Sequence, residues 1–257
     1  MIFINFYADY SVDVLEGSEN YNRVCSRSHA AEAIKSESDI NTVVNYLIHA
    51  ERWRDLLLFV MGINFGFRCG DLLSLRIGDV VDASGRIVRS FKIKEEKTGK
   101  IRPAAMNPAV VNALRLFLEN VYGDQPVDRN AYLFTSQSRN ASGTQPVPLT
   151  VRSVERLLKE IVNDRCHIPV HASTHMMRKT FAYHFLMKAP DRSRALELLS
   201  MQLNHTSVAY TLRYIGITQD EILQTCFNIE LGNTTGSKSE LPNVVDLNVY
   251  RHSVEEA

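Results

Sequence analysis

The chain has 257 residues, of which 45% are hydrophobic, and its 29 acidic and 29 basic residues cancel to no formal net charge. This length can hold one large domain or two small ones, and the apolar fraction is ordinary for a globular protein with a sizeable core. The zero net charge argues against a uniformly basic protein that coats DNA.

The charge is nevertheless unevenly distributed along the chain. Residues 86–102 hold seven Lys or Arg and two acids, and residues 150–214 hold ten and five. The ends are acidic, because residues 1–50 carry seven acids and three bases, and residues 216–257 carry seven and two. A basic middle is what a phosphate backbone requires, since Lys and Arg displace its counterions. Ordinary solvated surfaces would show the same pattern.

The cysteines and the apolar stretches indicate the compartment. The four cysteines are Cys25, Cys69, Cys166 and Cys226. They form no CxxC pair and no zinc-like spacing, which predicts reduced thiols. Residues 1–6 lack a basic flank and are followed by Asp9, which argues against a signal peptide. The longest apolar stretch, 56–67, is too short to span a bilayer. These features predict a soluble cytoplasmic protein with no membrane partner.

The first predicted helix follows Ser38, which can act as its N-cap, with Asp39 in the first turn where an acid favours the helix dipole. Apolar residues then recur at helical spacing. They are Ile40, Val43, Val44, Leu47 and Ile48. This pattern predicts an amphipathic helix.

Two more helices are predicted before the pattern changes. One runs from about Arg52 into the stretch Phe59–Asn64. The other follows Gly66 and holds Arg68 and Asp71 one turn apart. Its inward-facing leucines are Leu72, Leu73 and Leu75.

Residues 87–94 change from helical to alternating periodicity. Phe91 and Ile93 alternate with two lysines, which is typical of a half-buried strand. The turn 95–100 leads into a second extended segment. The sequence therefore predicts a hairpin with Lys97 at its tip.

The rest of the chain is predicted to be helical with one long loop. Helices are expected over 108–121 and 151–162, and residues 136–148, rich in Ser, Asn, Gly and Pro, read as a surface loop. Ser173 or Thr174 can cap a further helix. The predicted class is α+β, mainly helical with a small antiparallel β-sheet.

Four widely spaced motifs carry the chemistry. They are Gly66-Phe67-Arg68-Cys69-Gly70-Asp71-Leu72-Leu73-Ser74-Leu75, Lys97-Thr98-Gly99-Lys100, His175-Met176-Met177-Arg178, and His205 followed nine residues later by Tyr214. Attack on a phosphodiester needs a nucleophile, cations that neutralise the phosphorane and a proton for the leaving oxygen. In this order and spacing, the motifs resemble the tyrosine recombinase (phage integrase) family, whose catalytic-domain fold is then expected over residues 38–230.

The resemblance implies six catalytic positions and one supporting position. They are Arg68, Lys97, His175, Arg178, His205 and Tyr214, with Asp71 in the supporting role. In the family the two arginines clamp the non-bridging phosphate oxygens, for which a planar, always charged fork is suited. The lysine protonates the departing 5′ oxygen, and the tyrosine attacks the phosphate to form a 3′-phosphotyrosyl enzyme.

The spacing of the last motif requires a bend in the chain. Nine residues on one continuous helix would place His205 and Tyr214 on opposite faces. Thr206 or Ser207 can cap a fresh helix, which lets both side chains reach one site. Asn204 stands where the family commonly has a glycine.

Structural alternatives apply to each position. An isolated helix arginine is usually in a surface salt bridge, and Lys94 and Lys100 compete for the role of the hairpin lysine. Tyr210 shares a helical face with the proposed nucleophile. His171 and His175 could pair on a metal, but no third ligand or matching carboxylate follows. No metal or cofactor is therefore predicted.

The resemblance implies a site-specific DNA recombinase that performs integration, excision, inversion or resolution. A type IB topoisomerase, or a catalytically idle DNA-binding regulator with the same fold, are the alternatives. The expected domains are a short extension over 1–37 without a full core-binding domain, a catalytic domain over 38–232 and an acidic, disordered tail over 233–257.

The implied partners are double-stranded DNA, three further copies of the chain in a tetramer on DNA, and accessory DNA-bending proteins, in a cytoplasmic, nucleoid-associated setting. A capping box at Thr218–Glu221 predicts a terminal helix. In the family such a helix commonly docks on a neighbouring protomer.

Overall fold

A computed structural model describes residues 31–215, apart from 124, 126, 137–146 and 206. The chain divides into two units after Gly216, and every described element belongs to the first. The elements are α3 (Glu37–His49), α4 (Trp53–Phe65), α5 (Cys69–Leu73), α6 (Ile77–Val80), β1 (Ser90–Lys94), β2 (Ile101–Ala105), α7 (Pro108–Val121), α8 (Val151–Leu158), the π-helix η1 (Lys159–Arg165), α9 (Thr174–Met187), α10 (Arg192–Leu203) and α11 (Val208–Ile215). They confirm the predicted α+β class, mainly helical with a small antiparallel sheet.

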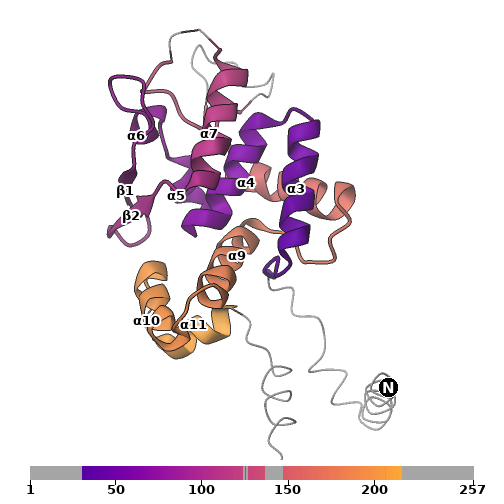
Figure 1. The fold of residues 1–257 in the computed structure, drawn as a ribbon, viewed down its shortest axis with the longest axis vertical. Helices are drawn as coiled ribbons and strands as arrows, with labels where there is room; N and C mark the ends of the chain where they lie inside the picture. The colour runs from indigo at the N-terminus through magenta and orange to yellow at the C-terminus, as the bar shows by residue number, and fades with distance from the viewer. Residues whose placement is uncertain (1–30, 124, 126, 137–146, 206, 216–257) are drawn as a thin grey trace, which may run out of the picture. The chain divides into compact units, whose positions relative to one another are not determined.

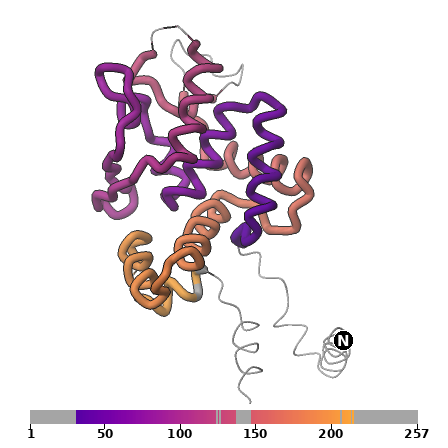
Figure 2. The backbone as a smooth tube through the Cα atoms, in the orientation of Figure 1, coloured from indigo at the N-terminus to yellow at the C-terminus, as the bar shows by residue number. Residues whose placement is uncertain are grey.

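Helix α4 lies at the centre of the core. Every residue from Leu56 to Gly62 is buried, because the helix is apolar on nearly all sides and is stable only when it is surrounded. Helices α3, α7 and α9 pack against it. The tube in Figure 2 shows how segments from distant parts of the sequence gather around this helix.

Helices α10 and α11 pack on α9 and on each other. In Figure 1 they lie together at one end of α9, away from α7. This arrangement brings the last two described helices of the chain to the end of α9, so that residues from α9 and α11 can share a site.

The structure corrects the boundaries of two N-terminal elements. Ser36, not Ser38, is the N-cap of α3, and its Oγ accepts a hydrogen bond from the Asp39 N–H at 3.2 Å. This earlier start places two acids, Glu37 and Asp39, in the first turn, where they favour the helix dipole. Arg68 lies outside the helix that was predicted to hold it. It is the extended N-cap residue of α5, because the chain has only just left α4.

Of two further predicted helices, one has the predicted bounds and the other is only partly α-helical. Helix α7 spans the predicted residues 108–121, with Pro108 in its first turn and the Asn107 side chain accepting from the Val110 N–H at 3.0 Å. The helix predicted over 151–162 is α-helical only to Leu158. It then widens into η1, in which hydrogen bonds follow the π pattern.

The β1–β2 hairpin confirms the predicted alternation. Phe91 and Ile93 are buried, whereas the lysines on either side of Ile93 are exposed. The strands pair antiparallel, with Phe91 opposite Ala104 and Ile93 opposite Arg102. Lys97 lies in the loop between the strands, as predicted.

Two left-handed residues redirect the chain next to the site. Gly66 ends α4 with φ 60°, and a Cβ at this position would lie 2.2 Å from the Phe181 ring, so both the backbone and the packing require glycine. Asn204 ends α10 with φ 56° and ψ 42°. Asparagine tolerates this conformation better than most residues, which explains how it can stand where the family commonly has glycine.

Several predictions lie wholly or partly outside the described residues. They are the extension over 1–37, most of the loop 136–148, the terminal helix after 218, the tail over 233–257, and the thiol states of Cys25 and Cys226. Within the described part of the chain, Cys69 and Cys166 are free thiols. No helix in that part is long and apolar enough to cross a membrane.

Candidate active site

Arg178 is the most firmly held of the predicted site residues. It lies on α9 and is 3% exposed. Its Nη1 donates to the Gly66 carbonyl and its Nη2 to the Leu203 carbonyl, both at 2.7 Å. These carbonyls belong to the C-terminal ends of α4 and α10, so one guanidinium ties three helices together. Burial lowers the pKa of Arg178, yet an arginine stays charged in proteins.

Arg68 is held by carboxylates instead of carbonyls. Its Nη1 lies 2.9 Å from Glu95 Oε2 and 4.0 Å from Asp71 Oδ2. The side chain remains 28% exposed, although Nη1 itself is buried. The atoms of Arg68 that are exposed are therefore others than Nη1, and they remain available to a ligand.

A small cavity unites three predicted residues from two separate motifs. It measures about 180 Å³ and is lined by Arg68, His175 and Arg178, together with residues at the starts of α5, α8 and α9. Burial first, and then the charges of Arg178, Lys179 and Arg68, lower the pKa of His175. The cavity is therefore a cationic recess beside a neutral imidazole, which suits an anionic ligand.

His205 and Tyr214 come together as the predicted bend requires. A new helix, α11, starts after Ser207, whose Oγ accepts from the Tyr210 N–H at 3.1 Å. The rings of His205 and Tyr214 then meet edge to face, with centroids 5.0 Å apart. The prediction that a capped helix brings both side chains to one place is confirmed.

The hydrogen bonds around His205 favour one tautomer. Its Nδ1 lies 3.0 Å from the buried Thr211 hydroxyl, which in turn is placed to donate to the Ser207 carbonyl at 3.3 Å. That hydroxyl is then left to accept from Nδ1–H, so the free lone pair of the neutral ring is on Nε2. Burial and the charges of Arg178, Arg68 and Arg102 lower the pKa of His205 to about 4, which keeps the ring neutral at pH 7.

The Tyr214 hydroxyl is buried and forms no hydrogen bond within the described residues. Burial raises the pKa of this phenol, and the neighbouring Arg178 charge opposes the rise. The Lys179 ammonium lies 5.4 Å from the centre of the Tyr214 ring. One cation, Arg178, therefore acts on the oxygen that would carry negative charge on ionisation, and a second, Lys179, lies over the ring.

The competing tyrosine and lysines lie in different surroundings. Tyr210 is 52% exposed and contacts the edge of His205 at 4.8 Å between centroids. Lys97 is exposed at the hairpin tip and, within the described residues, forms no hydrogen bond or ion pair. Lys100 binds the side-chain oxygen of Asn204 instead. The structure thus brings five of the six predicted residues into one neighbourhood and leaves Lys97 at its edge.

Three charged residues near the site were missed by the sequence reasoning. Glu95 is fully buried and pairs with Arg68 and Arg102, and Lys179 lies over the predicted nucleophile. The alternation of the two strands already indicated that Glu95 and Arg102 are a pair. Glu95 continues the inward series of Phe91 and Ile93, and Arg102 also points inward. A charge at an inward strand position must find a partner.

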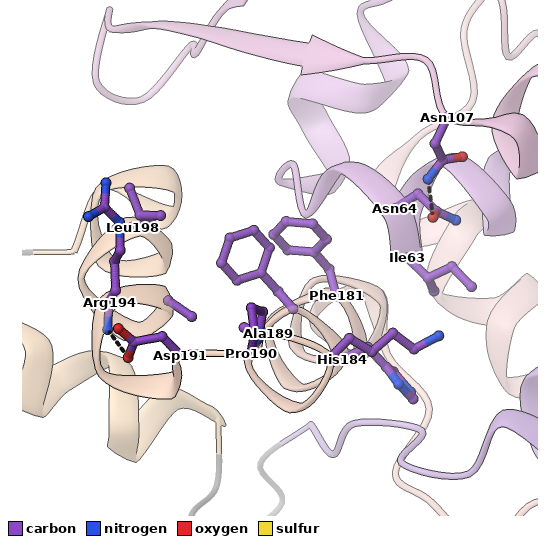
Figure 3. A pocket seen from close by; sticks show the side chains of 13 residues that line it. Ile63, Asn64, Asn107, Phe181, His184, Ala189, Pro190, Asp191, Arg194 and Leu198 are labelled. Atoms are coloured by element: carbon purple, nitrogen blue, oxygen red, sulfur yellow. Dashed lines mark hydrogen bonds between the residues drawn. The ribbon is translucent and has the colours of Figure 1, made fainter.

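A second hollow lies apart from these residues. It is a cavity of about 540 Å³, formed largely by α9, α10 and the segment between them. Figure 3 shows its lining side chains, among them Phe181, His184, Arg194 and Leu198. This cavity holds none of the six predicted catalytic residues. Within the described residues, no three His, Cys, Asp or Glu side chains form a group that could hold a metal.

Comparisons with known proteins point to the same chemistry. Residues 34–221 match the model of the phage integrase family. The probable integrase/recombinase YoeC of Bacillus subtilis is 30% identical over 192 residues, which cover 75% of this chain and 93% of that protein. The tyrosine recombinase XerC of Myxococcus xanthus is 29% identical over 192 residues, which cover 75% of this chain and 57% of XerC.

Solved structures of recombinases share the fold. The XerA recombinase superimposes with a TM-score of 0.57 at 22% identity, covering 79% of this chain and 67% of that one. The XerH recombinase, bound to a palindromic difH substrate after cleavage, gives 0.54 at 20% identity, covering 74% and 51%. The chain thus spans nearly all of the Bacillus relative but about half the length of XerC and XerH.

Proposed function

The chain belongs to the phage integrase family, and from its site we propose that it is a site-specific tyrosine recombinase that cleaves and rejoins double-stranded DNA. The observation that carries the proposal is the position of Tyr214. Its hydroxyl is buried beside Arg178, its ring is under Lys179, and His205 touches its edge. A structural tyrosine has no need of two cations and a neutral imidazole.

The proposed reaction forms one bond and breaks one bond in each step. The Tyr214 oxygen attacks phosphorus, and the bond from phosphorus to the 5′ oxygen breaks, so that no phosphate bond energy is lost. Arg68 and Arg178 neutralise the charge on the non-bridging oxygens. The phenolic proton goes to a neutral imidazole, His175 or His205, and Lys97 protonates the departing oxygen. The reverse attack by a 5′ hydroxyl from a partner duplex completes strand exchange.

A nicked suicide substrate tests this proposal directly. We expect wild-type protein to form a covalent adduct with the DNA, and Tyr214→Phe to form none while it still binds DNA. The variant should fold normally, since the hydroxyl that it loses has no hydrogen-bond partner among the described residues. Tyr210→Phe is the matched control and should retain the adduct. An adduct that survives Tyr214→Phe and disappears in Tyr210→Phe would contradict the assignment.

Two further measurements separate the alternatives. Cleavage should persist in excess EDTA, because arginines and a lysine supply the positive charge in the proposed mechanism. Activity lost on chelation and restored by magnesium would exclude that mechanism. Relaxation of supercoiled DNA without exchange between two sites would indicate a type IB topoisomerase, and binding without any adduct would indicate an idle regulator.

The assembly and setting are part of the proposal. We infer that the active form is a tetramer on DNA, assisted by accessory DNA-bending proteins, in the nucleoid of the cytoplasm. Residues 38–232 are proposed as the catalytic domain, which limited proteolysis would test. Removing residues 218–257 should reduce two-site recombination more than single-site cleavage. Equal loss of both, with a lower melting temperature, would instead indicate that this segment packs on its own chain.

A further inference from the structure

Glu95 is the most completely enclosed carboxylate around the site. It follows β1 on the inward side of the hairpin and is 0% exposed. Its Oε1 accepts from Arg102 Nη1 at 2.9 Å, and its Oε2 accepts from the Thr98 hydroxyl at 2.7 Å. The same Oε2 forms an ion pair with Arg68 Nη1 at 2.9 Å, without the geometry of a hydrogen bond. The Glu95 side chain, at the end of β1, therefore contacts strand β2, the loop that carries Lys97, and a predicted catalytic arginine.

We propose that Glu95 is the positioning residue for Arg68, fixing the orientation in which this arginine meets the scissile phosphate. This inference rests on the proposed function and adds a residue to it. Glu95 engages only Nη1, the buried nitrogen of Arg68, and leaves the exposed part of the side chain toward the 180 Å³ cavity. The guanidinium is a planar, rigid fork, so a contact at Nη1 restricts where its remaining donors can point.

Asp71, the supporting residue suggested by the sequence, is less well placed for this task. Its Oδ2 is 4.0 Å from Arg68 Nη1 and forms no hydrogen bond among the described residues. Its Oδ1 accepts from the Glu96 backbone N–H at 2.9 Å. Asp71 therefore fastens the hairpin backbone to α5, while Glu95 contacts the arginine itself.

A carboxylate beside a phosphate-binding arginine could instead compete with the phosphate. Two features argue for orientation over competition. Glu95 is anchored by Arg102 and Thr98 as well as by Arg68, so it cannot swing away when a phosphate arrives. Arg102, at 4% exposed, balances its charge and stacks 5.0 Å from the centre of the Phe67 ring. Burial alone would raise the pKa of Glu95, but hydrogen bonds from Thr98 and Arg102 and the ion pair with Arg68 outweigh it and lower the pKa to about 2.

The test uses single-turnover cleavage of a suicide substrate by Glu95→Gln, which keeps the size of the side chain and removes its charge. We expect the cleavage rate to fall by about 10–100-fold, the loss that follows removal of a group that orients a metal ligand, and the Kd for DNA to change far less than the rate. Glu96→Gln is the matched control: it removes a neighbouring, exposed carboxylate and should cleave at the wild-type rate.

Two altered substrates show through which residue Glu95 acts. A methylphosphonate at the scissile position is uncharged, so it needs the arginine less, and the deficit of Glu95→Gln should shrink on it. A sulfur in place of the 5′ bridging oxygen leaves without a proton, so it bypasses Lys97 and should not restore the variant. A deficit that shrinks on the sulfur substrate alone would overturn the inference, because Glu95 would then act through the hairpin lysine.

A binding measurement keeps the inference testable without cleavage. In a Tyr214→Phe background, the protein that keeps Glu95 should bind the charged duplex more tightly than the methylphosphonate duplex. Adding Glu95→Gln should reduce the ratio of these two affinities. An unchanged ratio, or tighter binding of the charged duplex by Glu95→Gln, would overturn the inference. If the wild-type protein, which carries Tyr214, forms no covalent adduct, that result counts against the proposed function and not against the role of Glu95.

A second variant guards against simple misfolding. Glu95→Gln leaves Arg102 buried without its anion, which can itself destabilise the protein. The double variant Glu95→Gln with Arg102→Met removes both buried charges. If its melting temperature returns toward wild type while the cleavage deficit and the reduced binding ratio persist, the deficit comes from Arg68. Recovery of cleavage together with the melting temperature would show a merely structural role.

Discussion

The helical side of the site and its hairpin side are held by different means. On the helical side, Arg178 binds two backbone carbonyls at the ends of α4 and α10, so its position is fixed by the core. On the hairpin side, Arg68 is held by the Glu95 side chain and Lys97 has no described partner. Arg178, which is fixed by backbone carbonyls, therefore stabilises the fold. Lys97, which is exposed, affects the chemistry without stabilising the fold.

Arg178→Met should break this comparison most severely. The change removes the donor of two buried carbonyls, and each unsatisfied carbonyl costs roughly 1–3 kcal/mol. We expect the free energy of unfolding to fall by about 2–4 kcal/mol and the covalent adduct to disappear. Chemical denaturation followed by circular dichroism measures the first effect. Lys97→Met is the matched control from the hairpin side and should unfold like wild type. Equal stability of both variants would show that the carbonyl contacts of Arg178 do not stabilise the fold.

Lys97→Ala should affect chemistry and not stability. General acid catalysis is worth about 10²–10⁴-fold in rate, so single-turnover cleavage should slow within that range. A substrate with a 5′ bridging sulfur should restore the rate, because its leaving group needs no proton. Lys94→Ala and Lys100→Ala are the controls, and neither should respond to the sulfur. If Lys100→Ala responds in place of Lys97→Ala, the proton donor has been assigned to the wrong lysine.

The two sides also differ in how far the sequence predicted them. The helical side was predicted well because its signals are local: the span from His205 to Tyr214 contains its own capping residue, and the helix that holds Arg178 was placed correctly. The hairpin was likewise predicted from its alternation. What the sequence reasoning missed was the pairing of Glu95 with Arg68, which are separated in the chain and meet only when the hairpin packs beside α5.

The errors in helix boundaries have local physical causes. Ser36 and Ser38 are both acceptable caps, and the choice depends on a first turn that gathers two acids. The π-helical continuation after Leu158 keeps the apolar pattern of an α-helix for several residues, so the pattern alone could not reveal it. These two errors leave the site unchanged, because neither segment carries a predicted catalytic residue, whereas the third error moved Arg68 from inside α5 to its N-cap.

The pH dependence of stability should report the electrostatics of the helical side. The folded pKa of His205 is about 4, below its ordinary value of 6.5, because of burial and the charges of Arg178, Arg68 and Arg102. Between pH 6.5 and 4 the unfolded chain therefore binds a proton that the folded protein does not, so stability falls as the pH drops through this window. His205→Gln should flatten that part of the curve. Identical pH profiles for wild type and His205→Gln would contradict the lowered pKa.

Asn204→Gly should give the smallest effect and tests the link between the two sides. The Asn204 side-chain oxygen accepts a hydrogen bond from the Lys100 ammonium on the hairpin. Glycine suits the left-handed backbone at this position at least as well, so the substitution removes only the side-chain contact. An exposed contact to a charged group is worth about 0–1 kcal/mol, and we expect stability to change by no more than that. Cleavage should slow only a few-fold, because the contact restrains the hairpin without touching the phosphate.

Lys100→Met should have the same effect, and the double variant should add nothing further if the two side chains act as one contact. Additive effects of the two substitutions would show that the hairpin and the α10–α11 turn act independently.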